Sequence, residues 1–299
     1  MKALTAARAL AARVGSRLVS SPTTHEPPLV VVFSADGALR LELFLRSYAQ
    51  QLSTPLPLTV LCHASTDAHR QAYEAVFAGY QASELTAIGE GAFKPALLAV
   101  LKASNVRHVI FFEDDMVFVQ PVDSRLLEQW EPGDGILSLR LGRNITRSQG
   151  RGGIEQPQPA QLEGATLGDQ TLVRWRWSAG ALDWAQPASL AGHLLPLPDL
   201  VPVIEQARFE TPGSLEVAIG QYQFLFKGRW GYCWEHSRVM SLVAGARQPE
   251  SAELQLDAFR RGLRLDISQL PLAQHDSCQM PWEPALQPAA DISQQPGGA

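Results

Sequence analysis

The sequence predicts an α/β protein with a mostly parallel central sheet and helices on both faces. Two observations carry this prediction. Short apolar runs rich in β-branched and aromatic residues, typical of buried parallel strands, lie at Leu29–Ser34, Leu58–His63 and Val109–Phe112. The segments between them place apolar residues at helical spacing, so strands and helices alternate as in a parallel sheet.

Composition agrees with this fold class and limits the function. The chain has 299 residues, of which 45% are hydrophobic, enough for one large α/β domain or two smaller ones. Its net charge of −5 argues against nucleic acid as the main partner. The three cysteines lie far apart without CxxC spacing, which argues against a disulfide framework or a zinc site and favours a reducing compartment.

The first half contains the clearest elements. Its first strand ends at the polar turn Ala35-Asp36-Gly37, and an amphipathic helix follows over residues 41–52. Thr66 is placed to cap the next helix, and Pro95 lies in the first turn of a helix over Ala96–Lys102. The strand before the acidic residues 113–115 then completes a β-α-β-α-α-β order.

The second half has weaker signals. Asp123 is placed to cap a short helix, and another helix is expected to begin at Thr211. An irregular insertion is expected at residues 142–171, because Gly, Gln and polar residues dominate there. Further elements are expected as strands at 135–141, 230–234 and 264–267 and as helices at 124–129 and 254–262.

The two ends differ from the middle of the chain. Residues 1–28 form a basic amphipathic segment, interpreted either as weak contact of residues 1–20 with an anionic membrane surface or, as we favour, as an ordinary packed or frayed terminus. Arg8 and Arg13 argue against a secretory signal peptide, and no apolar run approaches the ~20 residues that span a bilayer. Residues 283–299 are expected to be a disordered tail.

The most informative stretch is VIFFEDDMVFV, residues 109–119, where a buried strand runs directly into Glu113, Asp114 and Asp115. Open α/β sheets bind ligands beyond the carboxyl ends of their strands. Three adjacent carboxylates there need a compensating cation, and a divalent metal that bridges carboxylates to phosphates is the simplest one. A solvated turn is the alternative, and these residues alone leave both interpretations open.

The order LVVVFS–ADG–helix–strand–helix–VIFFEDDMVFVQPVD resembles the GT-A fold of nucleotide-sugar-dependent glycosyltransferases, whose DxD-type motif appears here as EDD. The later segments WRWSAGALDW, TPGSLE and RLDIS…DSC are compatible with an enzyme of the bacterial polysaccharide type. The resemblance implies a single GT-A (Rossmann-like) domain over residues 29–282. It consists of a nucleotide-sugar-binding half, 29–123, and an irregular acceptor half, 124–282.

The resemblance also implies roles for individual residues. Asp115, helped by Asp114, would hold Mn²⁺ or Mg²⁺ against the donor diphosphate, and His275 is the candidate late ligand, with His236 as second choice. Gln279 lies in the same late segment, so the third protein ligand stays open. The residues expected to bind the nucleotide sugar are Ser34, Asp36, Lys94, Glu113, Asp114 and Arg140.

An inverting transfer needs a general base for the acceptor hydroxyl, and the candidates are Glu216, Glu210 and Asp183. An ordinary acid near a helix start is an equally good interpretation of Glu216, and a retaining reaction would need no such base. Three tryptophans either stack on an acceptor sugar or fill the core, and we favour the core; they are Trp175, Trp177 and Trp184.

The function expected from this resemblance is metal-dependent transfer of a sugar, of the hexosyltransferase type, from a nucleotide-sugar donor to a glycan or other hydroxyl acceptor. The enzyme would be cytoplasmic, with a peripheral position at the inner face of a membrane as a second interpretation. The alternative is a degenerate GT-A-like domain that binds without transferring. A haloacid-dehalogenase phosphatase is disfavoured because Ser34 stands where its nucleophilic Asp belongs. A sugar-nucleotide pyrophosphorylase is disfavoured because the chain has no Gly-rich, basic loop after the first strand. A dinucleotide oxidoreductase is disfavoured because the chain has no GxGxxG motif.

Overall fold

The structure is a computed structural model that describes residues 26–80, 83–89, 91–131, 133, 135–244, 251–268, 270, 272–283 and 285–289. The expected membrane contact of residues 1–20 lies outside the described residues, as do most of the N-terminal segment and residues 290–299 of the tail. Among the helices that the structure describes, none combines the length and the apolar character needed to cross a bilayer.

A nine-stranded sheet forms the centre of the molecule, in the order β3-β2-β1-β4-β11-β6-β12-β10-β9. Its first four strands are parallel to one another, as the sequence predicts. They are β1 (Leu29–Ala35), β2 (Leu58–His63), β3 (Ser83–Ala87) and β4 (His108–Glu113). β3 was not predicted, because its edge-strand sequence SELTA has little apolar character.

Strands from the second half of the chain extend the same sheet. They are β11 (His193–Pro196), β6 (Ile136–Ser138), β12 (Trp230–Cys233), β10 (Gln170–Arg176) and β9 (Glu163–Leu167). Within this described sheet only β11 and β10 run against the other strands, so the sheet is mostly parallel. The expected α/β class, a mostly parallel central sheet between helices, is therefore confirmed.

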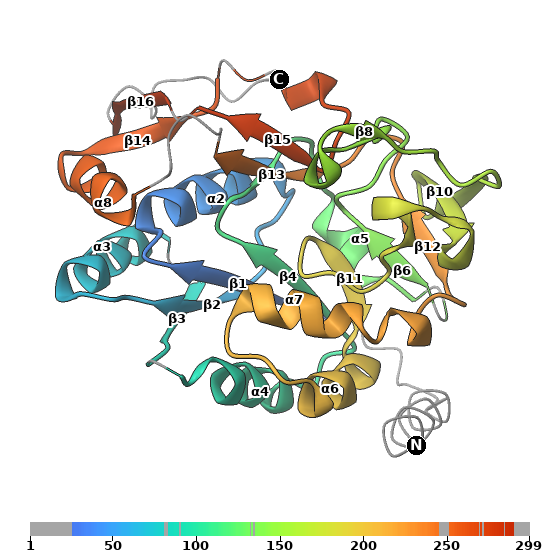
Figure 1. Ribbon diagram of the computed structural model, residues 1–299, viewed down its shortest axis with the longest axis horizontal. Coiled ribbons are helices and arrows are strands. Elements are labelled where there is room, and N and C mark those ends of the chain that lie inside the picture. Colours follow the sequence, from blue (N-terminus) through green and yellow to red (C-terminus); the bar gives the residue numbers. More distant parts are fainter. Residues whose placement is uncertain are drawn as a thin grey trace.

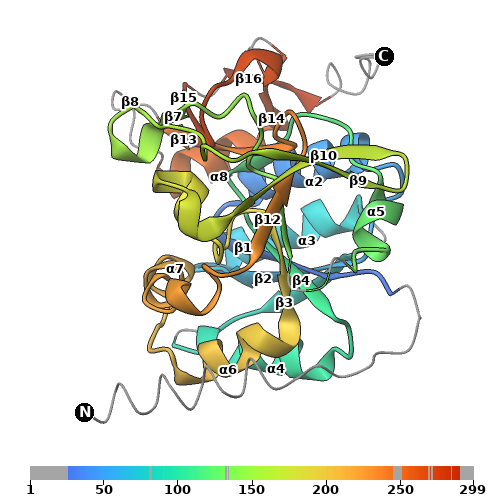
Figure 2. The same cartoon turned by 90° about the vertical axis from the view of Figure 1, so that its right-hand side faces the viewer.

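Helices cover both faces of the sheet, as Figures 1 and 2 show. Side chains alternate along β1, so Val30 and Val32 pack on one side and Val31 and Phe33 on the other. The first side is covered by α2 (Ala38–Gln51), α3 (Asp67–Ala78) and α8 (Ala252–Arg260). The second side is covered by α4 (Phe93–Ala103), α6 (Leu197–Gln206) and α7 (Pro212–Gly220).

Helix starts follow the expected capping chemistry. The Thr66 hydroxyl accepts a hydrogen bond from the His69 N–H at 3.3 Å and begins α3. Asp123 caps the short helix α5 (Ser124–Glu128). At α7, Thr211 and Ser214 form a reciprocal capping box, and Pro212 occupies the first turn. These caps fix where α7 meets the end of the sheet.

Smaller sheets hold the late segments. β5 (Met116–Phe118) pairs with β13 (Val239–Ala244), which pairs with β15 (Gln279–Trp282). β14 (Leu263–Asp266) pairs with β16 (Ala285–Pro288), so part of the expected disordered tail is a strand, because ladder hydrogen bonds order a segment that buries little apolar surface.

The insertion at 142–171 is more ordered than expected. It contains β7 (Arg147–Ser148), paired with β8 (Ile154–Glu155), and β9 of the central sheet. Single 3₁₀ turns occur at Gln149–Arg151, Trp177–Ala179, Leu182–Ala185, Gln223–Leu225 and Leu272–Gln274.

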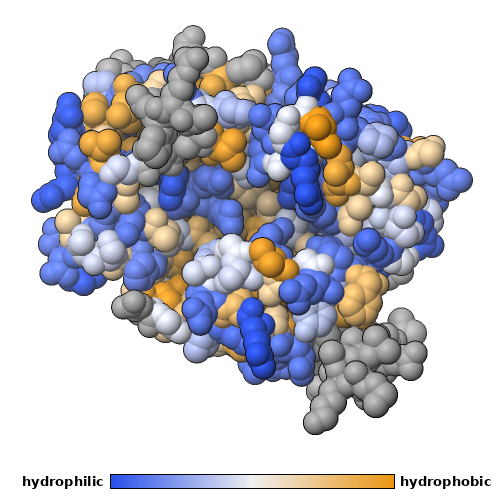
Figure 3. All heavy atoms as spheres, viewed as in Figure 1, coloured by the Kyte–Doolittle hydropathy of each residue, from blue (hydrophilic) through white to orange (hydrophobic). Residues whose placement is uncertain are grey.

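The three tryptophans belong to the core, as favoured. Trp175, Trp177 and Trp184 are fully buried, and Trp175 packs edge-on against both others. On the face in Figure 3, hydrophilic residues predominate and hydrophobic ones are scattered. The large apolar side chains exposed in the described part are Ile154, Val217, Phe224, Leu254 and Leu286.

Candidate functional site

A cavity of about 480 Å³ lies at the carboxyl ends of β1, β2, β3 and β4. The order of these strands is what brings their ends together, as open α/β sheets do at their ligand sites. The start of α7 closes another side through Glu210, Thr211 and Pro212. The lining combines apolar side chains with carboxylates.

The apolar lining residues include Phe33, Leu61, Ile88 and Phe93. Phe33 and Phe93 pack edge-to-face with ring centroids 5.3 Å apart, which holds both rings in place. His63 also lines the cavity, with its Nδ1 3.2 Å from the Ile88 carbonyl oxygen.

Asp114 is buried in contacts with α2 and β1. Its Oδ1 lies 3.0 Å from the Arg40 Nε on α2, and its Oδ2 accepts a 2.5 Å hydrogen bond from the Ser34 hydroxyl. Ser34 in turn lies 2.7 Å from the Tyr73 hydroxyl, which accepts the Gly37 N–H at 2.9 Å. Ser34 and Asp114, which were each expected to bind the nucleotide sugar, therefore contact each other directly.

Glu113 ends β4 and lines the same cavity. Burial, followed by the negative charges of Glu216 and Asp114, raises the pKa of Glu113 to about 7. The positive charges of Arg140 and Arg40 act in the opposite direction. Near neutral pH this carboxyl is therefore poised between its two protonation states, and a cation bound in the cavity would favour the ionised one.

Asp115 lies in the lining where the chain turns from β4 into β5. Its backbone oxygen accepts the Leu242 N–H at 2.8 Å, which fixes the turn to β13. Carboxylate oxygens at the cavity are the hard donors that Mn²⁺ or Mg²⁺ takes, so the donor set fits a divalent metal. Among the described residues, however, no three His, Cys, Asp or Glu side chains gather as a metal-binding group.

His275 does not lie in this lining. Its Nε2 contacts the Ser237 hydroxyl and lies 3.1 Å from the Asn144 amide, and its Nδ1 lies 2.5 Å from the Leu272 oxygen. Both ring nitrogens are thus engaged within the fold, and burial lowers the pKa of His275. The structure does not bring the expected late ligand to Asp115.

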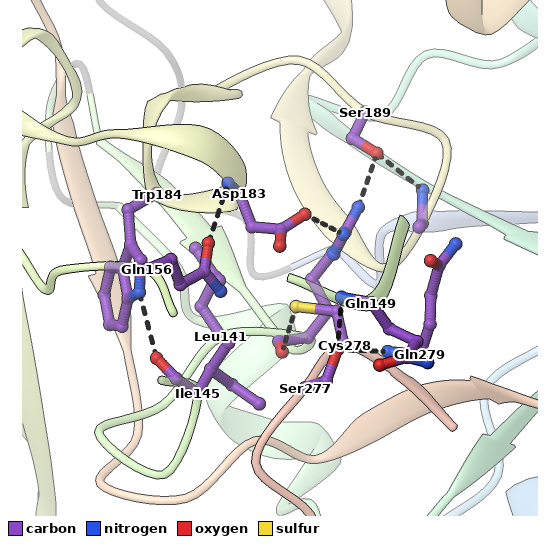
Figure 4. A network of polar contacts seen from close by, with 12 residues as sticks. Leu141, Ile145, Gln149, Gln156, Asp183, Trp184, Ser189, Ser277, Cys278 and Gln279 are labelled. Atoms are coloured by element: carbon purple, nitrogen blue, oxygen red, sulfur yellow. Dashed lines mark hydrogen bonds and ion pairs between the residues drawn. The ribbon is translucent and has the colours of Figure 1, made fainter. Parts of the chain in front are cut away.

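Arg140, Asp183 and Glu216 form a network outside the cavity lining, close enough for Arg140 and Glu216 to act on the charge of Glu113. Figure 4 shows Asp183 and Ser189 of this network. The Arg140 guanidinium donates to Asp183 Oδ1 at 2.8 Å and to the Ser189 hydroxyl at 3.2 Å. The carboxylate of Glu216 accepts the Ser189 hydroxyl at 2.9 Å and the Leu190 N–H at 2.7 Å. Of the three candidate bases, only Glu210 lines the cavity.

Two other residues that were expected to bind the nucleotide sugar make their contacts elsewhere in the fold. The Lys94 ammonium donates to the backbone oxygens of Glu205 at 3.0 Å and Ala207 at 2.5 Å, and so caps the end of α6. Asp36, with a left-handed φ of 49°, accepts the Ser65 N–H at 2.8 Å. It joins the loops after β1 and β2 without lining the cavity.

Arg40 also lines the cavity, and the sequence did not predict it as a site residue. It lies in the first turn of α2, directly after the turn that ends β1. The signal was present, because the first turn of a helix that follows a parallel strand lies at the same edge of the sheet as the strand end. Ile88 was not predicted to line the cavity because it follows β3, a strand that the sequence did not predict.

Comparisons with known proteins give structural likeness alone. No family model and no curated protein matches the chain. TarS of S. aureus is 12% identical over 72% of this chain and 37% of its own, with a TM-score of 0.43. The bifunctional glycosyltransferase WbbM is 14% identical over 42% of this chain and 25% of its own, with a TM-score of 0.29.

A mannosyltransferase of Pyrobaculum calidifontis, PcManGT, determined with GDP-Man and Mn²⁺, is 17% identical over 48% of this chain and 52% of its own, with a TM-score of 0.28. The chain thus spans between a quarter and about half of the length of WbbM and PcManGT. At these identities and TM-scores the likeness carries no argument about function, which has to come from the site.

Proposed function

We propose that this protein transfers a sugar from a nucleotide-sugar donor to a hydroxyl acceptor with the help of a divalent metal. One observation carries the proposal: a cavity at the carboxyl ends of four parallel strands is lined both by aromatic side chains and by the acidic residues 113–115. A nucleotide sugar has the matching parts, a flat base and a charged diphosphate.

In this proposal the base lies against Phe33 and Phe93, and the diphosphate lies at Glu113–Asp115. Asp115 is the residue we assign to hold Mn²⁺ or Mg²⁺, since its carboxylate lines the cavity at the turn. A metal bound there supplies Lewis-acid stabilisation of the charge that develops on the departing nucleoside diphosphate. Ser34, which lines the cavity, is a further residue that we assign to donor binding.

Glu210 is the best of the three candidate bases. It is exposed and lines the cavity, so an acceptor hydroxyl can reach it. Glu216 is held by Ser189 and Leu190, and Asp183 by Arg140, so both carboxylates already serve the fold. For an inverting transfer we therefore assign proton removal from the acceptor to Glu210.

The test is calorimetric titration of UDP, GDP, dTDP and CMP, and of their sugars, with and without Mn²⁺. We expect one nucleotide class to bind, and only in the presence of metal. The Asp115→Asn variant should lose about a hundredfold or more of that metal-dependent affinity, because even the loss of a residue that only orients a metal ligand costs about 10- to 100-fold. Equal affinity with and without metal, or in wild type and variant, would contradict the assignment.

Acceptor-dependent turnover separates a transferase from a domain that only binds. Release of nucleoside diphosphate should rise when a panel of glycan acceptors is added to the bound donor. Tight donor binding with no release in the presence of any acceptor would instead indicate the degenerate binding domain.

A further inference from the structure

The acidic residues 113–115 have different surroundings in the structure, and their sequence alone does not indicate which role each of them has. We propose that Asp114 is a positioning residue that holds the Arg40 guanidinium at the cavity, where Arg40 binds the diphosphate of the donor, while the metal falls to Asp115. This inference rests on the proposed function and names a further binding residue for it.

The two oxygens of Asp114 are already used inside the protein. Arg40 takes Oδ1 at 3.0 Å and Ser34 takes Oδ2 at 2.5 Å, and the Asp114 side chain is only 8% exposed. Each oxygen already faces a protein donor, and with so little of the side chain exposed, few of its lone pairs can turn toward a metal in the cavity. Asp114 is therefore built to orient its neighbours.

Gly37 shows how closely this arrangement is packed. A Cβ at Gly37 would lie 2.1 Å from Asp114 Oδ2 and 2.9 Å from an Arg40 terminal nitrogen. The Gly37 N–H is also held by Tyr73, whose hydroxyl contacts Ser34. β1, α2 and α3 together thus fix the angle at which Arg40 enters the cavity, so that little ordering remains to be done when a ligand binds.

Charge at the cavity gives Arg40 its role. The acids that line the described cavity are Glu113, Asp114, Asp115 and Glu210. Arg40 is the only Arg or Lys among the described residues of that lining. An anionic diphosphate cannot enter such a surface without cations, and a guanidinium offers five N–H donors in a fork that matches phosphate oxygens. The Nε contact with Asp114 uses one edge of this fork.

The experiment measures metal and nucleotide separately. Affinities for UDP and for GDP in Mn²⁺ are taken by calorimetry, and Mn²⁺ affinity without nucleotide by electron paramagnetic resonance. We expect Arg40→Gln to weaken binding of the nucleotide that wild type prefers by about ten- to a hundredfold, with Mn²⁺ affinity unchanged. Arg70→Gln removes an equally positive but exposed side chain from α3 and should bind like wild type.

Asp114→Asn should show the same pattern, with weaker nucleotide binding and unchanged Mn²⁺ affinity. Asp115→Asn should lose Mn²⁺ binding. The double variant Arg40→Gln/Asp114→Asn should bind nucleotide no more weakly than Arg40→Gln alone, because both changes remove one contact. If the role of Asp114 were purely structural, Asp114→Asn would lower the melting temperature without this non-additivity.

Arg40→Lys is a second variant at Arg40, needed because Arg40→Gln leaves the buried Asp114 without its cation. Its nucleotide affinity should fall by an intermediate amount, because Lys keeps the positive charge but lacks the forked N–H donors of Arg.

The outcomes separate the two proposals. Wild type that binds none of the nucleotides overturns the proposed function and this inference with it. Wild type that binds UDP or GDP with Mn²⁺, together with Arg40 variants of equal affinity, overturns only the inference. Loss of Mn²⁺ in Asp114→Asn overturns it as well, because Asp114 would then be a metal ligand.

Discussion

Acidic residues gather in two regions of this molecule, and their surroundings differ. In the buried network, Asp183 pairs with Arg140, and Glu216 accepts two hydrogen bonds from Ser189 and Leu190. Around the cavity, the acids of the lining share Arg40 as the one Arg or Lys among the described lining residues. In the network, the protein itself supplies the cation and the hydrogen-bond donors that stabilise the carboxylates, and the acids stabilise the fold. At the cavity the protein supplies few such groups, and we propose that a bound ligand provides the rest.

Glu210→Gln tests the cavity side of this contrast with the largest expected effect. The amide keeps the size of the side chain but cannot accept a proton, so kcat for nucleoside diphosphate release to an acceptor should fall by about 10²–10⁴-fold. Donor affinity, measured by calorimetry, should stay within about twofold because no donor contact is assigned to Glu210. Glu74→Gln, an exposed acid on α3, is the matched control. A normal kcat in Glu210→Gln would remove Glu210 as the base.

Arg140→Ala tests the network side. Removing one partner of a buried pair leaves the Asp183 carboxylate without its cation, so the free energy of unfolding should fall by about 3–5 kcal/mol. Urea denaturation followed by fluorescence of the buried tryptophans measures this change. Arg143→Ala breaks the half-exposed pair with Glu235 and should change stability by less than about 1 kcal/mol.

A double replacement sharpens the same comparison. Arg140→Met with Asp183→Leu removes both charges and should recover much of the stability that Arg140→Ala loses, because neither buried charge is left alone. No recovery would mean that the network holds the fold through its hydrogen bonds to Ser189 rather than through the ion pair.

The sequence predicts the first half of the fold well because its strands are buried on both sides. Continuous apolar runs such as Val109–Phe112 have a strong pattern, and they fix where Glu113 and its neighbours lie at the sheet edge. β3 at the sheet edge lacks such a run, and β9 pairs with β10 through backbone hydrogen bonds that impose no apolar pattern.

Side-chain direction is what the sequence could not give at the site. Lys94 and Arg140 are near the cavity elements in sequence, yet their charged groups meet oxygens of α6 and of Asp183. Those partners are 111 and 43 residues away along the chain. His275 likewise finds Ser237 and Asn144 through long-range packing. Contacts of this kind depend on tertiary structure, whereas the place of Asp115 follows from one strand end.

His193 next to the network gives the smallest expected effect, a change in pH dependence. His193 is fully buried in β11, with its Nδ1 3.1 Å from the Pro187 oxygen. Burial, reinforced by the positive charge of Arg140, lowers the pKa of His193 to about 3. The unfolded chain has an ordinary His pKa of about 6.5, so between these values the unfolded state binds one proton more than the folded state.

Folded-state stability should therefore fall as pH drops below about 6.5, by about 1.4 kcal/mol per pH unit from this residue, and should not depend on it above that pH. His193→Asn keeps an N–H donor for the Pro187 oxygen but does not titrate. Urea unfolding at pH 7.5, 6.5, 5.5 and 5.0 should give a shallower acid slope for the variant, whatever its stability at pH 7.5. Parallel curves for wild type and variant would mean that the pocket beside Arg140 admits a charged imidazole, and the network would then be more open to solvent than its burial indicates.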